Sequence, residues 1–201
     1  MRRADRKRSV TRICVIQGHP SGGNSHFCHA LADAYVEGAL SMGHEVRTIV
    51  IADLDFPILR SKQDWDIGQP PTAIVSAQDT IRWAQHLLIA HPLWIGSMPA
   101  LLKAFLEQAL RPGFAMSTSA KGGWTKLLSG RSARVVVTMG MPAFVYRWYF
   151  GAHGLKSLTQ NLSLVGISPS RSTLIGSIEG MAEAKRGRWL QRLGSLGKQA
   201  A

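Results

Sequence analysis

The chain is poor in cysteine. Of its 201 residues only Cys14 and Cys28 carry thiols. The two show no CxxC motif and no His/Cys metal-ligand spacing, so a cysteine-based metal site is not expected. Cys14 lies inside an apolar run and is predicted to be a small buried hydrophobe. This usage fits a reducing compartment, and we expect a cytoplasmic protein.

Acidic residues are also scarce. Twelve Asp and Glu stand against 24 Lys and Arg, which gives a formal net charge of +12. The basic residues concentrate near both ends of the chain: Arg2, Arg3, Arg6, Lys7, Arg8 and Arg12, then Lys185, Arg186, Arg188, Arg192 and Lys198. A solvated tail and an exposed helix face explain such runs, while binding to an anionic membrane or nucleic acid stays open. No motif for specific nucleic-acid recognition accompanies the charge.

No uninterrupted hydrophobic run is long enough to span a membrane. The most apolar stretch, residues 87–110, is broken by polar residues, glycine and proline, and its pattern indicates a strand, a turn and a helix. The basic N-terminus is not followed by the apolar segment of a secretory signal. We therefore expect neither a signal peptide nor a membrane span, and peripheral membrane association stays open.

Apolar runs alternate with helical periods along the rest of the chain. The predicted strands are 12–17, 46–51, 86–91, 133–139 and 171–177, and the predicted helices are 25–42, 73–85, 99–110, part of 142–162, and 179–196. This alternation predicts an α/β domain over 12–201 with a parallel sheet covered on both faces, preceded by a basic tail over 1–11. The irregular segments 57–72 and 111–130 are candidate lids or dimer contacts.

Three loops that follow predicted strands, 17–25, 91–99 and 138–146, share one edge of such a sheet, where ligands bind. The first runs from Gly18 to Ser25 and comes close to a triphosphate loop, but Asn24 replaces the lysine that reaches the phosphates. No acid follows a later strand to hold Mg²⁺, so an NTP-binding protein is the less favoured alternative. A phosphate site without metal, lined by His19, Asn24 and Ser25, is the favoured interpretation.

The other two loops are apolar and rich in turn residues. His91–Pro99 carries Trp94 at the point where a strand emerges, and Thr138–Pro142 combines small residues with backbone donors. One phosphate loop beside two such loops suits a planar aromatic cofactor with a phosphate tail, and a flavin fits best. Tyr146 and His153 are possible proton or hydrogen-bond donors to the same cleft.

Short segments of the sequence resemble a known family. They are Gly-His-Pro at 18–20, Pro-Leu-Trp at 92–94, Met-Pro-Ala-Leu-Leu-Lys at 98–103, Pro-Gly-Phe-Ala at 112–115 and Val-Thr-Met-Gly at 137–140. Together they resemble the flavodoxin-like NAD(P)H:quinone oxidoreductases, which include DT-diaphorase-type enzymes and the oxidoreductase subunits of bacterial potassium-efflux systems. The resemblance covers roughly residues 12–180.

The resemblance implies a flavodoxin-like three-layer sandwich, with a five-stranded parallel sheet in the order 2-1-3-4-5 and helices on both faces. It implies a metal-free homodimer that binds FAD or FMN and passes a hydride from NAD(P)H to a quinone-like acceptor. A flavin-binding ancillary subunit with little turnover is the alternative. The matching positions are His19, Ser25 and Phe27 for the phosphate, Pro92, Leu93, Trp94 and Ile95 for one edge of the ring system, Thr138, Met139 and Gly140 for the other, and Tyr146 and His153 for charge stabilisation during hydride transfer.

Overall fold

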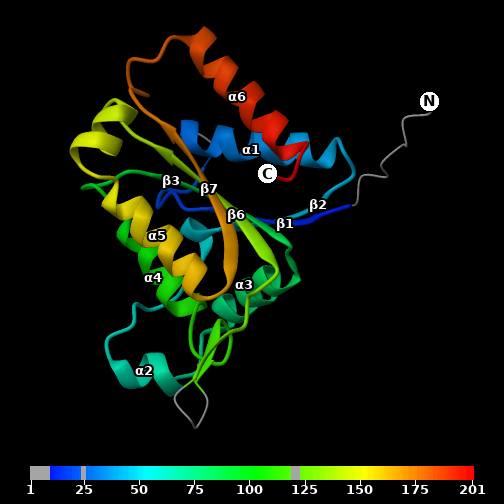
Figure 1. Ribbon diagram of the computed structural model, residues 1–201, viewed down its shortest axis with the longest axis vertical. Coiled ribbons are helices and arrows are strands. Elements are labelled where there is room, and N and C mark those ends of the chain that lie inside the picture. The colour runs from blue at the N-terminus through cyan, green and yellow to red at the C-terminus, as the bar shows by residue number, and fades with distance from the viewer. Residues whose placement is uncertain (1–9, 24–25, 119–122) are drawn as a thin grey trace.

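The computed structural model describes residues 10–23, 26–118 and 123–201. The strands of its main sheet are β1 (Arg12–Gln17), β2 (Glu45–Val50), β3 (His86–Pro92), β6 (Arg131–Thr138) and β7 (Ile167–Ile175). The helices are α1 (Phe27–Leu40), α2 (Lys62–Ile67), α3 (Thr72–Trp83), α4 (Ala100–Ala109), α5 (His153–Leu164) and α6 (Glu183–Gly197). Shorter elements are η1 (Ile51–Asp53), the hairpin β4 (Met116–Thr118) and β5 (Trp124–Lys126), and the π-helical turn η2 (Val145–Tyr149). Figure 1 shows their arrangement.

The main sheet has the order β2-β1-β3-β6-β7, and every pair in it is parallel. Counted within this sheet, the order is 2-1-3-4-5, so the predicted topology is confirmed. All seven residues of β3 are buried, as a strand flanked by two neighbours and covered on both faces must be. The loops that leave β1, β3 and β6 therefore emerge side by side at one edge.

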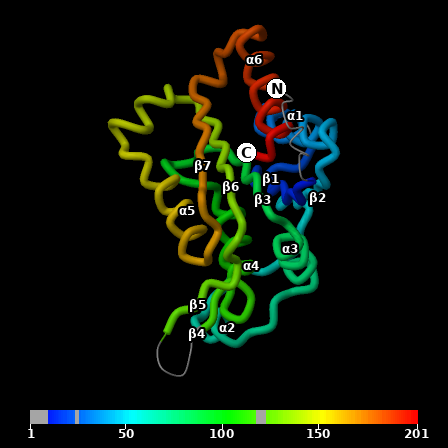
Figure 2. Tube along the Cα trace, turned by 45° about the vertical axis from the view of Figure 1, so that its right-hand side comes forward, coloured from blue at the N-terminus to red at the C-terminus, as the bar shows by residue number. Residues whose placement is uncertain are grey.

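Alternate residues along the strands serve two separate apolar layers. In β1, Ile13 and Val15 pack with α1 and α6, whereas Cys14 and Ile16 face the layer of α3, α4 and α5. Figures 1 and 2 show α1 and α6 together on one side of the sheet, with α3, α4 and α5 on the other. This is the three-layer arrangement expected from the sequence.

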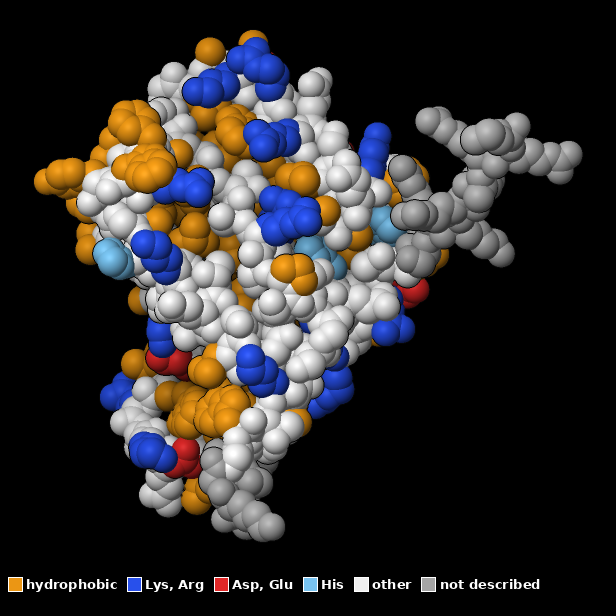
Figure 3. All heavy atoms as spheres, viewed as in Figure 1, with side chains coloured by type: hydrophobic (Ala, Val, Ile, Leu, Met, Phe, Trp, Pro, Cys, Tyr) orange, Lys and Arg blue, Asp and Glu red, His pale blue; other side chains and the backbone are white. Residues whose placement is uncertain are grey.

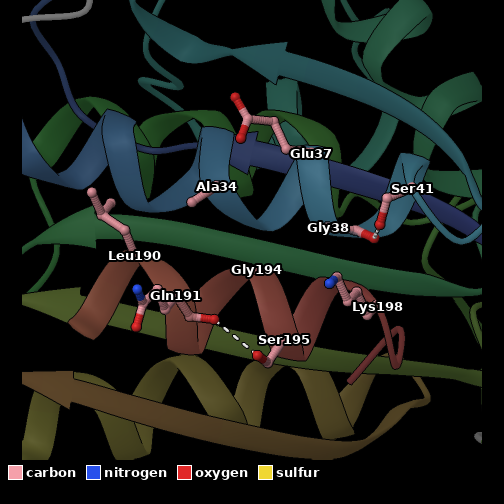
Figure 4. A pocket seen from close by; sticks show the side chains of 9 residues that line it. All are labelled: Ala34, Glu37, Gly38, Ser41, Leu190, Gln191, Gly194, Ser195 and Lys198. Atoms are coloured by element: carbon pink, nitrogen blue, oxygen red, sulfur yellow. Dashed lines mark hydrogen bonds between the residues drawn. The ribbon is translucent and has the colours of Figure 1, made fainter. Parts of the chain in front are cut away.

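Glycines let α1 and α6 approach each other to backbone contact. A Cβ on Gly38 would lie 2.0 Å from the Gly194 carbonyl oxygen, and one on Gly197 would lie 2.0 Å from that of Tyr35. A hollow of about 510 Å³ lies along this α1–α6 seam (Figure 4). The hydroxyls of Ser41 and Ser195, which line it, donate to backbone oxygens of their own helices. The hollow is thus a by-product of close helix packing.

Several elements differ from the sequence-based expectation. Segment 57–72 contains the helix α2. Ser61 is its N-cap, because the Ser61 hydroxyl accepts a 3.0 Å hydrogen bond from the Asp64 amide. Segment 111–130 contains the β4–β5 hairpin. The helix expected within 142–162 is divided into η2 and α5 because Gly151 and Ala152 adopt left-handed φ angles of 64° and 49°.

The edge strand β7 is longer than predicted and begins at Ile167. It contains Pro169, whose missing N–H is tolerated at the edge of a sheet. Within the described residues, no helix is both long and apolar enough to cross a membrane.

Candidate functional site

The loops after β1, β3 and β6 contact one another at the carboxyl edge of the sheet. The Gly18 amide donates to the Ala90 carbonyl at 2.7 Å, and the Leu93 amide donates to the Thr138 carbonyl at 2.8 Å. The rings of His19 and Trp94 meet edge to face, with centroids 6.2 Å apart. Three segments distant in sequence thus form one surface, as expected from the topology.

Gly18 is required by the packing beneath this surface. A Cβ at this position would lie 2.7 Å from Cδ2 of Leu102 and 3.0 Å from the Ala90 carbonyl oxygen. Any larger residue would push the loop after β1 away from β3 and α4. The glycine therefore sets how closely the first two loops approach.

A cluster of histidines occupies the start of α1. His19 stacks on His26 with ring centroids 3.9 Å apart, and His29 lies 5.3 Å from His19. Burial and the neighbouring His26 lower the pKa values of His19 and His29, so both are neutral near pH 7. The Ser21 amide donates to Nδ1 of His19, whereas Nε2 of buried His29 has no partner within the described chain.

The histidine cluster has the chemistry of an anion site. Protonated imidazoles donate from both nitrogens, and the N-terminus of α1 adds its partial positive charge. A bound phosphate would favour the protonated rings and supply the partner that His29 lacks. Within the part of the chain that the structure describes, no group of three or more His, Cys, Asp or Glu residues is placed to hold a metal ion.

The residues before the second loop are held rigidly. His91 is fully buried, and its Nδ1 donates to the Pro92 carbonyl at 2.9 Å. Burial lowers the pKa of His91 to about 4, so the ring is neutral. The neutral ring fixes the end of β3, from which Leu93 and Trp94 leave.

The second loop is a strained tight turn. Trp94 and Ser97 exchange two 2.9 Å backbone hydrogen bonds, and between them Ile95 and Gly96 have φ angles of 46° and 75°. Positive φ at both central residues defines a type I′ turn, in which a β-branched residue is rarely found. Ile95 is fully exposed and Trp94 is half exposed, so this strained turn projects an apolar surface into solvent.

The third loop combines buried anchors with an open glycine. Thr138 and Met139 are buried, and the Cys28 thiol hydrogen-bonds with Thr138. Burial raises the pKa of Cys28 to about 12, so this thiol is not a nucleophile near neutral pH. Gly140 is exposed, and a Cβ there would lie 2.9 Å from a carboxylate oxygen of Glu179.

Free backbone donors line the same edge. Within the described chain, the amides of Ile95, Gly96, Gly140 and Met141 have no hydrogen-bond acceptor. A flavin has a flat apolar ring system, a polar pyrimidine edge that needs such donors, and a phosphate tail. Apolar Trp94 and Ile95, these amides and the histidine cluster match those three parts, so the residues present fit the group.

The two residues with predicted roles in charge stabilisation differ in exposure. Tyr146 is buried, and its hydroxyl accepts a 3.1 Å hydrogen bond from the Leu155 amide and lies 3.5 Å from the Gly96 carbonyl oxygen. It therefore ties the strained turn to the start of α5. His153 is exposed beside Gly151. Burial raises the pKa of Tyr146, which keeps its hydroxyl protonated.

The remaining predicted positions fall in two groups. Asn24 and Ser25 lie outside the described residues. Phe27 packs toward α6, where the guanidinium of Arg186 lies 5.2 Å from its ring centroid. Sequence reasoning missed His26, His29 and Glu179. The spacing of His26 and His29, three apart at a helix start, was a readable signal, whereas the approach of Glu179 depends on the tertiary fold.

Comparison with known proteins agrees with this geometry. The model of the flavodoxin-like fold family Flavodoxin_2 matches residues 11–195. The chain belongs to this family. A solved NAD(P)H:quinone oxidoreductase from Methanothermobacter marburgensis superposes with a TM-score of 0.77 at 20% identity, over 95% of this chain and 97% of that one.

Two curated relatives carry functional names. An FMN-dependent NADH:quinone oxidoreductase of Ruegeria pomeroyi is 25% identical over 150 residues. The match covers 66% of the present chain and 72% of the relative. The glutathione-regulated potassium-efflux system ancillary protein KefG of Serratia proteamaculans is 41% identical over 70 residues, or 35% of this chain and 36% of that protein.

Proposed function

We propose that this protein is a flavin-dependent NAD(P)H oxidoreductase that transfers a hydride to a quinone-like acceptor. The observation that carries the proposal is the meeting of the three loops, where the amides of Ile95, Gly96, Gly140 and Met141 have no acceptor among the described residues and a histidine cluster lies at the same edge. The bound flavin would supply two-electron chemistry, accepting a hydride from the nicotinamide and giving it to the acceptor.

The residues of the chain bind and orient the cofactor. Pro92, Leu93, Trp94 and Ile95 hold one edge of the ring system, and Thr138, Met139 and Gly140 hold the other. On this proposal, the phosphate would be bound by His19, Asn24, Ser25 and Phe27. FMN is the favoured flavin because the Ruegeria pomeroyi relative is FMN-dependent, and FAD is the alternative.

Tyr146 and His153 are proposed to stabilise charge during hydride transfer. The buried Tyr146 hydroxyl acts through the Trp94–Ser97 turn, and His153 presents an exposed imidazole near the same end of α5. We expect Tyr146→Phe and His153→Gln to slow flavin reduction while the flavin stays bound. Unchanged stopped-flow reduction rates in both variants would remove these residues from the mechanism.

The decisive test is direct. The purified protein, supplied with FMN or FAD, is expected to be yellow, to bleach anaerobically with NADH or NADPH, and to regain its colour when a quinone is added. Extraction of the flavin identifies the cofactor, and the reduction rates identify the preferred nicotinamide. A protein that stays colourless in the presence of either flavin contradicts the proposal.

A second function is favoured by one observation, the 41% identity to KefG over 70 residues. In that case the chain would be a flavin-binding ancillary subunit of another protein, with little turnover. A yellow protein that is reduced by NAD(P)H but not reoxidised by quinones would favour this role. For either function we propose a homodimer in the cytoplasm; light scattering tests the dimer, and cell fractionation tests the location.

A further inference from the structure

An unusually exposed group of aromatic side chains lies on and beside η2. We call residues 144–150 the aromatic segment. Phe144, Trp148 and Tyr149 are 67%, 80% and 82% exposed, and the rings of Tyr149 and Phe150 contact each other edge to face at 5.0 Å. Single exposed hydrophobic residues are common in folded proteins, whereas a contiguous exposed aromatic surface of this kind marks an interaction site.

The aromatic segment is held in place from beneath. Tyr146 is buried, its hydroxyl accepts a hydrogen bond from the Leu155 amide, and its carbonyl accepts one from the Ala152 amide. The Phe150 amide donates to the Val145 carbonyl and closes the π-helical turn. The exposed rings are therefore presented by a backbone fixed to α5.

Positive charge predominates around the aromatic segment, although the Glu179 carboxylate lies close to Gly140 in the loop that precedes it. Residues 108–178 contain no Asp or Glu, whereas they contain eight Lys or Arg. Arg147 and Lys156 are exposed next to the aromatic side chains. Figure 3 shows hydrophobic side chains gathered at the end of the molecule where this segment lies, with basic groups beside them, while the acidic groups on that face lie well away.

A hollow of about 590 Å³ adjoins the aromatic segment, between α5 and the edge strand β7. Arg147 and Lys156 line it together with the hydroxyl-bearing Ser172. No Asp or Glu of the described chain lines it. Two cations and the hydroxyl-bearing Thr159, Ser170 and Ser172, without a carboxylate, have the chemistry that recognises a phosphate group.

Two binding partners could cover such a surface: a second copy of the chain or an anionic bilayer. A two-fold interface uses the same patch on both subunits, and among the described residues that line this hollow there is no Asp or Glu to pair with Arg147 or Lys156 of a second copy. An anionic bilayer offers phosphates to the cations and an interfacial layer in which Trp and Tyr rings are favoured. Charge complementarity favours the bilayer.

We propose that the aromatic segment docks on an anionic phospholipid bilayer, with Trp148 and Tyr149 entering the interfacial layer while Arg147 and Lys156 contact lipid phosphates. The contact is peripheral, because aromatic side chains on one short turn reach only the interfacial layer. Tyr146 joins this segment to the Trp94–Ser97 turn, so docking holds the candidate site next to the membrane. If the proposed function is correct, that position favours acceptors dissolved in the bilayer.

Vesicle flotation of the full-length protein tests the docking without any turnover. We expect binding to phosphatidylcholine vesicles that contain phosphatidylglycerol and little binding to phosphatidylcholine alone. Trp148→Ala/Tyr149→Ala is expected to lower the partition coefficient about tenfold through lost apolar contact. Arg147→Gln/Lys156→Gln is expected to lower it about fivefold for each charge removed.

Controls separate this surface from the basic N-terminus. Arg2→Gln/Arg3→Gln weakens only the salt-sensitive part of binding, whereas the loss caused by Trp148→Ala/Tyr149→Ala persists at high salt. Trp124→Ala, which removes a partly exposed ring on β5 outside the aromatic segment, is expected to leave vesicle binding unchanged. Trp148→Phe should retain most binding.

Two results would overturn the proposal. One is vesicle binding that the aromatic and charge substitutions leave unchanged in proteins whose circular dichroism shows an intact fold. The other is a shift from dimer to monomer in Trp148→Ala/Tyr149→Ala without any binding of the parent protein to vesicles, which would assign the surface to a second copy. Flavin binding and reduction are measured separately, so a failure of the proposed function is distinguishable.

Discussion

The α1–α6 seam and the carboxyl edge of the sheet are built in opposite ways. In the seam, glycines bring two helices into backbone contact, and the lining hydroxyls bond within their own helices. At the edge, Ile95 has a left-handed φ, and within the described chain His29 has a buried nitrogen without a partner and several amides have no acceptor. The α1–α6 seam is closely packed, whereas the carboxyl edge of the sheet contains a strained backbone turn and polar groups without hydrogen-bond partners in the described chain.

This contrast indicates where stability and function are located. Close packing has no spare hydrogen-bonding capacity, so the seam offers little to a ligand. The edge is less stable by itself but offers preset donors, as sites do when the surrounding structure fixes them. Substitutions in the seam should therefore lower the free energy of unfolding most, whereas relief of strain at the edge should raise it.

The largest effect is expected at the seam. Gly38→Ala places a methyl group 2.0 Å from the Gly194 carbonyl oxygen, so the helices must separate. We expect the free energy of unfolding to fall by about 3 kcal/mol, measured by urea denaturation. Gly187→Ala is the matched control in α6, where a Cβ meets nothing within 4 Å, and it should add about 0.5–1 kcal/mol. Equal effects of the two substitutions would contradict the close contact.

The next effect is an acid sensitivity of the edge. The pKa of His91 is about 6.5 in the unfolded chain and about 4 in the folded one. The unfolded state therefore binds more protons, and stability falls as the pH drops from 6.5 toward 4, by about 3 kcal/mol for this group. His91→Leu should cost about 1 kcal/mol at pH 8 by removing the donor to Pro92, yet it should be the more stable protein at pH 4. Parallel pH profiles would contradict this.

A smaller loss is expected at Tyr146. Tyr146→Phe removes the acceptor of the Leu155 amide, which joins the strained turn to α5. Thermal and urea unfolding should show about 1 kcal/mol less stability. Tyr149→Phe is the matched control because its hydroxyl is exposed and has no partner in the described chain, so its stability should be unchanged. A loss in both variants would refute the specific role of the buried hydroxyl.

The smallest effect has the opposite sign. Ile95→Gly removes a side chain from a left-handed conformation and should raise the free energy of unfolding by about 0.5–1 kcal/mol. Ile58→Gly, at another exposed isoleucine without positive φ, should instead lower stability slightly. If the strain serves the site, Ile95→Gly should also weaken flavin binding, which fluorescence titration measures. A destabilised Ile95→Gly would mean that the turn is not strained.

The sequence predicted what depends on local pattern. The unbroken apolar run at residues 13–16 indicated a strand, the alternation of strands and helices indicated a parallel sheet covered on both faces, and the loops after β1, β3 and β6 then had to share an edge. The left-handed turn at Ile95 was not predictable, because its residue type argues against that conformation. The inward hydroxyl of Tyr146 depends on Leu155 and Gly96, which the sequence alone does not bring together. The N-cap of α2 has a local signal, a serine at 61 followed by an acid at 64, but the neighbouring prolines and charges favoured an irregular segment.

The contact of Gly38 with Gly194 also has a consequence for biosynthesis. The two glycines are separated by most of the chain, so α1 has no partner for its glycine face until the final helix has been made. Contacts between segments so distant in sequence close slowly, and the waiting surface is exposed to aggregation meanwhile. On the ribosome, the first helix of this protein completes its packing only when the last one emerges.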